Sequence, residues 1–127
     1  MKIAHIALWT QDLEQQARFW VEFFGGDINE KYCSKTNHGF ESYFVTINNT
    51  IAVELMTKPG LTRVTPDNNE TGWVHLAISL GSQQAVDAMA RRAEAQGILV
   101  SQPRTTGDGY YEAVISDPDG NLIEIVE

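Results

Sequence analysis

Two pairs of residues related by one offset constrain the fold of this chain more than any other feature. His5 and His75 are 70 positions apart, and Glu54 and Glu124 are also 70 positions apart. Each histidine opens a similar apolar pattern, HIAL in the first half and HLAI in the second. Each glutamate lies inside an apolar run, IAVELM and LIEIV. A shared internal offset indicates a duplicated structural unit.

The hydrophobic periodicity predicts the same order of elements in each half, a strand and a helix followed by three strands. Asp12 or Thr10 can cap the first helix and Ser82 the second, and Asn48-Asn49 is typical of a tight turn. The predicted elements of the first half are a strand over 3–9, a helix over 12–24, and strands over 29–34, 40–47 and 50–56. Those of the second half are a strand over 73–80, a helix over 82–96, and strands over 98–102, 110–116 and 122–126.

The chain therefore reads β-α-β-β-β twice, an α+β fold in which each helix covers one face of its sheet and leaves the other face free. With 127 residues, the length corresponds to one domain. We expect a single domain over 1–127, with modules at about 1–57 and 73–127. The Pro-, Thr-, Asn- and Gly-rich segment at about 58–72 is the expected connector.

Strand alternation predicts where the two glutamates point. Side chains along a strand alternate between its two faces, so Glu54 lies opposite Val53 and Leu55. The apolar side suits packing under a helix, and the glutamate side is then the free face of the sheet. The same pattern places Glu124 opposite Ile123 and Ile125. By the same alternation, His5 and His75 lie on their own strands.

A buried carboxylate costs several kcal/mol unless a cation compensates it. A divalent ion would compensate both glutamates, and imidazole with carboxylate suits Zn, Ni, Mn, Co or Fe. Taken singly, a strand histidine is more often a core or edge residue, and a strand glutamate more often faces solvent. Four such residues under one offset favour a metal site of His5, Glu54, His75 and Glu124. The solvent-facing alternative stays open for Glu54, which polar residues follow.

Composition excludes several classes of partner. The formal charge is −8, with 9 basic and 17 acidic residues, and nucleic-acid binding needs clustered basic residues. No apolar stretch approaches the ~20 residues of a membrane span, and the N-terminus has no signal-peptide pattern. The single cysteine, Cys33, cannot form an internal disulfide. We therefore expect a cytoplasmic protein that acts on a small molecule, without a nucleic-acid or membrane partner.

Taken together, these residues resemble the vicinal oxygen chelate superfamily, which contains glyoxalase I, bleomycin-resistance proteins and extradiol dioxygenases. The resemblance covers essentially the whole chain. It rests on the two histidine openings, the Glu54 strand and the closing motif DPDGNLIE at 117–124. It implies paired βαβββ modules that form an open, cupped mixed β-sheet barrel with the helices outside. It also implies a divalent metal ion in the barrel and a homodimer, with metal ligands from one chain or from two.

Within the superfamily, a His, Glu, His, Glu set is similar to that of glyoxalase I and related isomerases. Two positions depart from the glyoxalase I pattern. Trp9 stands where an Arg commonly follows the first ligand by four residues, and Lys58 stands where an Asn commonly follows the first Glu by four. In glyoxalase I that Arg helps hold glutathione. The departures argue against glutathione binding and favour a different, less polar substrate.

The expected activity is that of a metal-dependent, glyoxalase-like lyase or isomerase. The ion would polarise adjacent oxygens and stabilise an enediolate, and Glu54 or Glu124 would be the catalytic base that moves the proton. One alternative is a metal-free small-molecule or drug-binding resistance protein. Another is an extradiol-type Fe(II) dioxygenase with His5, His75 and Glu124 as the iron ligands, against which Glu54 argues.

Overall fold

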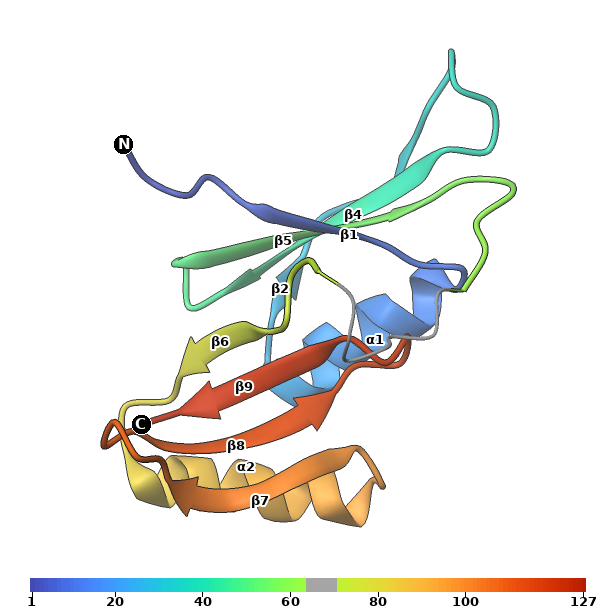
Figure 1. The fold of residues 1–127 in the computed structure, drawn as a ribbon. Helices are drawn as coiled ribbons and strands as arrows, with labels where there is room; N and C mark the ends of the chain where they lie inside the picture. Colours follow the sequence, from blue (N-terminus) through green and yellow to red (C-terminus); the bar gives the residue numbers. More distant parts are fainter. Residues whose placement is uncertain (64–70) are drawn as a thin grey trace. The chain divides into compact units, whose positions relative to one another are not determined.

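The chain divides into two compact units, Met1–Val64 and Thr65–Glu127. The structure is a computed structural model that describes residues 1–63 and 71–127, and Figure 1 shows its ribbon. The division falls inside the predicted connector at 58–72, of which residues 64–70 lie outside the described residues. That the two units form one domain stays a prediction.

The first unit is a mixed sheet with one helix. Its elements are β1 (Ile6–Trp9), α1 (Leu13–Phe24), β2 (Asp27–Ile28), β3 (Tyr32–Cys33), β4 (Glu41–Ile47) and β5 (Ile51–Thr57). The strands are ordered β1-β5-β4-β2, and β3 also pairs with β4. β1 runs parallel to β5, as Figure 1 shows, whereas β4 is antiparallel to β5. The sheet is open, because β1 and β2 are its two ends.

The second unit repeats this plan. Its elements are β6 (Leu76–Ser79), α2 (Gln83–Ala95), β7 (Leu99–Thr105), β8 (Tyr111–Ser116) and β9 (Leu122–Val126). The strands are ordered β6-β9-β8-β7, with β6 parallel to β9 and the other pairs antiparallel. Figure 1 shows α2 along the sheet of this unit. The predicted α+β class with a βαβββ order in each half is confirmed.

The predicted offset recurs in the strand register. In the first unit Ala7 is paired with Glu54, and in the second Ala77 is paired with Glu124. The antiparallel partners also repeat, because Phe44 lies opposite Glu54 and Val114 opposite Glu124. Each unit therefore places its glutamate in the same position between two neighbouring strands.

The helices begin at the predicted caps. The Asp12 side chain accepts a hydrogen bond from the Gln15 amide, and the Ser82 side chain accepts one from the Ala85 amide. These contacts satisfy amide groups that a helix start leaves without a partner. α1 ends at Gly25 in the left-handed conformation, with φ of 69°, which glycine adopts without a steric penalty.

Each core lies between the helix and one face of its sheet. In the first unit the fully buried residues include Trp20, Val45, Val53 and Leu55, and in the second they include Val86, Ile115, Ile123 and Ile125. Phe19 and Phe23 of α1 are buried as well, whereas Val21 and Phe24 are half-buried. Because the apolar residues beside each glutamate are buried, the glutamate face is the one that the helix does not cover, as strand alternation predicted.

Two strand predictions need correction. The first strand of each unit begins at Ile6 or Leu76, so His5 and His75 each lie one residue before a strand. The predicted strand over 29–34 is divided into β2 and β3, which pair with different parts of β4. Single-sequence patterns locate apolar runs well, but they do not show where backbone pairing starts or stops.

Candidate functional site

His5 and Glu54 form the first half of the candidate site. The parallel pairing of β1 with β5 places Ile6 beside Val53, so His5 lies near the start of β5, on the N-terminal side of Glu54. The Nε2 atom of His5 lies 3.5 Å from the Oε2 atom of Glu54, and the side chains are 43% and 18% exposed. The His5 ring also packs edge to face with Phe44, with ring centroids 5.4 Å apart. Phe44 thus packs beside the imidazole on the strand that neighbours Glu54.

His75 and Glu124 form the corresponding pair in the second unit. The Nε2 atom of His75 lies 3.4 Å from the Oε2 atom of Glu124, and the side chains are 36% and 15% exposed. Distance and exposure are therefore close to those of the first pair. The same atom types approach each other in both units, because the strand registers that carry them are related by the same offset.

The structure thus brings the four predicted metal ligands together as two His–Glu pairs, one inside each unit. Within the described residues of either unit, no group of three or more His, Cys, Asp or Glu side chains is arranged to hold a metal ion. A four-ligand site needs donors from both units. It stays a prediction, for which each unit provides one preformed His–Glu pair.

A third carboxyl group lies beside Glu124, and the sequence interpretation missed it. Glu112 of β8 forms a side-chain hydrogen bond with Glu124, and its side chain is only 12% exposed. Burial is the main cause that raises the pKa of Glu124, and the hydrogen bond with Glu112 is the next. The electrostatic interaction with His75 partly lowers this pKa. Arg104 Nη2 lies 3.7 Å from Glu112 Oε1. The offset could not reveal Glu112, because the equivalent position is Ser42; strand alternation, which puts Glu112 and Glu124 on one face, was the available signal.

The negative charges of Glu54 and Glu124 favour the binding of a cation. Among the described residues, neither Glu54 nor Glu124 forms an ion pair with a lysine or arginine. Each is largely removed from solvent beside an imidazole, so a cation would offset the cost of its burial. Imidazole nitrogen and carboxylate oxygen together suit a divalent transition metal. The donor set therefore fits such an ion.

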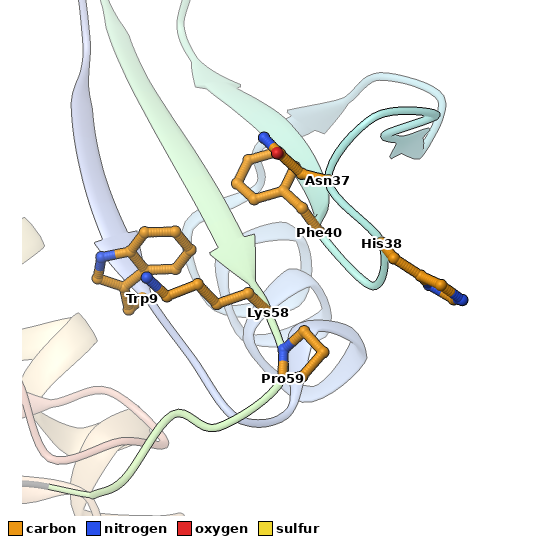
Figure 2. Close-up of a pocket in the computed structure, with 6 residues that line it drawn as sticks. All are labelled: Trp9, Asn37, His38, Phe40, Lys58 and Pro59. Carbon is orange, nitrogen blue, oxygen red and sulfur yellow. The ribbon is translucent and has the colours of Figure 1, made fainter.

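Trp9 and Lys58, the two departures from the glyoxalase I pattern, lie in contact with each other. Lys58 Nζ is 4.4 Å from the centroid of the Trp9 ring, a cation–π contact. Figure 2 shows the Lys58 side chain extending toward the indole. Both residues line a hollow of about 560 Å³ in the first unit, together with Asn37, His38, Phe40 and Pro59.

Two other residues behave as surface positions. His38 is exposed, and Figure 2 shows its ring pointing away from Trp9 and Lys58. Cys33 is exposed and makes no disulfide. Neither helix of the described segments has the length and apolar character to cross a membrane.

Comparison with known proteins identifies the class that this fold and these His–Glu pairs define. The chain belongs to the Glyoxalase/Bleomycin resistance protein/Dioxygenase superfamily, whose family model matches residues 2–125. It is 30% identical to the protein YqjT of Bacillus subtilis, with 96% of this chain and 95% of YqjT covered. It is also 30% identical to the protein PA2024 of Pseudomonas aeruginosa, with 96% of this chain and 85% of PA2024 covered.

Solved structures share the fold. A glyoxylase/bleomycin resistance protein/dioxygenase domain from Frankia sp. aligns with a TM-score of 0.85 at 16% identity, covering 99% of this chain and 96% of that one. The lactoylglutathione lyase of Agrobacterium tumefaciens aligns with a TM-score of 0.71 at 24% identity, covering 99% and 92%. The glyoxalase I of Leishmania major aligns with a TM-score of 0.78 at 19% identity, covering 100% and 86%. At these identities the likeness is one of fold.

Proposed function

We propose that this protein is a divalent-metal-dependent lyase or isomerase of the glyoxalase type, which transfers a proton next to a carbonyl group of a small molecule. The repeated His–Glu pair is the observation that carries the proposal. Two imidazole–carboxylate pairs at 3.5 Å and 3.4 Å, carried by the same strand register in both units, supply a symmetric donor set.

His5, Glu54, His75 and Glu124 would hold the ion. When bound, a divalent ion polarises the substrate oxygens that it contacts and stabilises negative charge that develops on them. The protein's own contribution is to hold the two glutamates on strands and the two histidines directly before strands, so that the imidazoles and carboxylates keep their separation. The partial burial of both glutamates excludes water from most of their surface.

A carboxylate is the proposed proton carrier. Glu124 is the stronger candidate, because burial and the hydrogen bond with Glu112 raise its pKa. A carboxyl group with a raised pKa is a better base than an ordinary one, since the most effective catalytic base has a pKa near the working pH. Glu112 acts through Glu124 and is a positioning residue in this proposal.

Metal analysis of the purified protein tests the proposal. We expect the wild-type protein to retain a divalent ion after gel filtration and to show a higher Tm when the ion is added, since a ligand that binds only the native state stabilises it. The double variant Glu54→Ala, Glu124→Ala should lose both properties. The matched control Glu30→Ala, Glu94→Ala changes two exposed glutamates, one in each unit, and should keep both. Equal metal content in all three proteins would contradict the site.

We also propose a homodimer, as is common for this superfamily. The ion can take both His–Glu pairs from one chain or one pair from each of two chains, and mixing single variants separates these arrangements. A sample of Glu54→Ala mixed with Glu124→Ala after subunit exchange regains metal binding only if the pairs come from two chains, because one of the two hybrid sites is then intact. If both pairs belong to one chain, the mixture stays deficient.

A metal-free small-molecule binding protein is the second candidate, and the hollow beside Trp9 favours it. Tight ligand binding by a protein that retains no metal and converts no substrate would support this function over the first. An Fe(II) dioxygenase would instead consume oxygen with a catechol, and the placement of Glu54 beside His5 argues against a site with three ligands. For each of these candidate functions we propose a cytoplasmic location, since Cys33 is a free thiol.

A further inference from the structure

We propose that the hollow beside Trp9 binds a small organic acid, with its anionic group on Lys58 and its flat apolar part against Trp9 and Phe40. The hollow belongs entirely to the first unit. Its volume of about 560 Å³ lies within the range of small-molecule sites. The inference goes beyond the proposed metal function, because no metal ion is needed for this binding.

The charge of Lys58 indicates an anionic ligand. Another lysine of the first unit, Lys31, is neutralised by ion pairs with Glu14 and Glu41. Among the described residues Lys58 has no acidic partner, and its ammonium group lies over the face of Trp9. A cation–π contact attracts the ammonium to the ring but does not neutralise its charge. The chain has a net charge of −8, and the Lys58 ammonium is a positive group with which an anionic ligand can form an ion pair.

The walls of the hollow indicate a flat apolar group next to that anion. Trp9 and Phe40 meet edge to face, with ring centroids 6.0 Å apart, and Phe40 meets Tyr32 in the same way at 6.3 Å. Trp9 is 44% exposed and Tyr32 is 54% exposed. Aromatic faces that remain accessible favour a ligand that stacks on or packs edge-on against them.

The loop that forms one wall is held in place before any ligand binds. The Phe40 amide donates to the Asn37 carbonyl at 3.0 Å, and the Ser34 amide donates to the Phe40 carbonyl at 3.0 Å. Gly39 adopts a φ of 80°, and a Cβ there would lie 2.6 Å from Pro59 Cγ. The loop therefore packs directly against the segment that carries Lys58. A preformed site loses less entropy on binding than a flexible one.

The hollow is a separate contact region from the His5–Glu54 pair. Trp9 lies four residues after His5 on the same side of its strand, and Lys58 lies four residues after Glu54. At a rise of about 3.3 Å per residue, four residues span roughly 13 Å. A ligand held at the hollow thus does not have to contact the imidazole or the carboxylate.

The test compares two ligands of one shape, 2-naphthoate and the neutral 2-naphthamide, in protein treated with a chelator. The indole N–H signals of Trp9, Trp20 and Trp73 are followed by NMR and assigned with Trp→Phe variants. We expect naphthoate to shift the Trp9 signal and to bind about tenfold more tightly than the amide, a difference of roughly 1.4 kcal/mol. Lys58→Met should remove that preference, whereas the control Lys2→Met, at an exposed position, should keep it.

Three results would overturn the proposal: a Trp9 signal that naphthoate leaves unchanged, equal binding of naphthoate and naphthamide, or an undiminished preference in Lys58→Met. A Trp9→Phe variant should still bind more weakly than the control Trp73→Phe, whose wild-type side chain is 97% exposed. The chelator keeps the metal proposal out of the measurement. Failure here would leave the metal-binding experiment unaffected, and loss of metal binding would leave this one unaffected.

Discussion

Glu112 and Glu124 share a hydrogen bond on the uncovered face of the second sheet. A hydrogen bond between two carboxyl groups needs one proton, so it favours the state in which one group is protonated. The first unit has Ser42 at the equivalent position, and the two His–Glu pairs consequently differ in the groups that surround them. In the proposed reaction this asymmetry gives the two glutamates different proton affinities.

The first prediction concerns the pKa of Glu124. Replacing Glu112 with Gln removes the shared proton but keeps a similar shape, so we expect the pKa of Glu124 to fall toward its ordinary value. Carboxyl-carbon NMR of chelator-treated protein measures it. The fall should be partial, because burial, the larger cause of the shift, persists. An unchanged pKa would show that the hydrogen bond contributes nothing.

The same shift fixes the sign of a pH effect on stability. Glu124 has a raised pKa in the folded state, so the native protein binds its proton more tightly than the unfolded chain does. The contribution of Glu124 to stability therefore declines as the pH rises from its ordinary pKa to its raised pKa. Urea unfolding across this pH window should show a smaller decline for Glu124→Gln than for the wild-type protein.

A second prediction concerns the phenol of Tyr111. Its hydroxyl donates to Asp87 Oδ1 at 2.7 Å, and this hydrogen bond is the main cause that raises the pKa of Tyr111 above 10.0. The phenol is neutral below that pH, so its effect appears only in alkali, where stability declines as the pH passes the ordinary value. We expect Asp87→Asn to lower the Tyr111 pKa in a ¹³C-tyrosine NMR titration. The variant Asp27→Asn, which changes an exposed aspartate of the first unit, serves as the control and should leave it unchanged.

A third prediction concerns the turn between β8 and β9. Asp117 is 4% exposed and accepts hydrogen bonds from the amides of Asp119 and Asn121 at 2.9 Å and 2.8 Å. Asp117→Ala leaves both amides without this acceptor, so we expect a loss of about 2–3 kcal/mol in the free energy of unfolding. Asp27→Ala, at an exposed position, should change it by less than about 0.5 kcal/mol. Equal urea midpoints for the two variants would contradict this role of Asp117.

A fourth prediction compares two glycines. A Cβ at Gly26 would overlap Val45 Cγ1 and lie 3.1 Å from the Trp20 carbonyl oxygen, whereas nothing lies within 4 Å of one at Gly107. Gly26→Ala should therefore destabilise the protein by about 1–3 kcal/mol, the usual cost of overpacking. Gly107→Ala should have little effect. Thermal unfolding of the two variants side by side measures the difference.

The repeated pattern allowed most of the fold to be predicted. The apolar runs at 51–56 and 122–126 became β5 and β9, with Glu54 and Glu124 on the predicted face. The predicted start of the first strand, at residue 3, was wrong, because β1 begins at Ile6. Backbone pairing with the neighbouring strand, rather than hydrophobicity, decides where an edge strand begins. The division of the predicted third strand arose because β2 and β3 pair with different parts of β4.

The candidate site was predictable only as far as symmetry extends. The offset related His5 to His75 and Glu54 to Glu124, and the structure places each histidine beside its glutamate. Glu112 has no carboxylate counterpart, so symmetry could not reveal it. The Trp9–Lys58 contact depends on how two side chains from different strands turn toward each other, which sequence spacing does not specify.

β1 and β6 lie at one end of their sheets, and among the residues that the structure describes each pairs with one neighbouring strand. Edge strands open locally at a lower free-energy cost than central strands do. His5 and His75 precede these strands, so local opening would carry the imidazoles away from the glutamates while β5 and β9 stay paired. Amide hydrogen exchange should therefore be faster in β1 and β6 than in β5 and β9, and a bound ion would slow it by tying each edge strand to its neighbour.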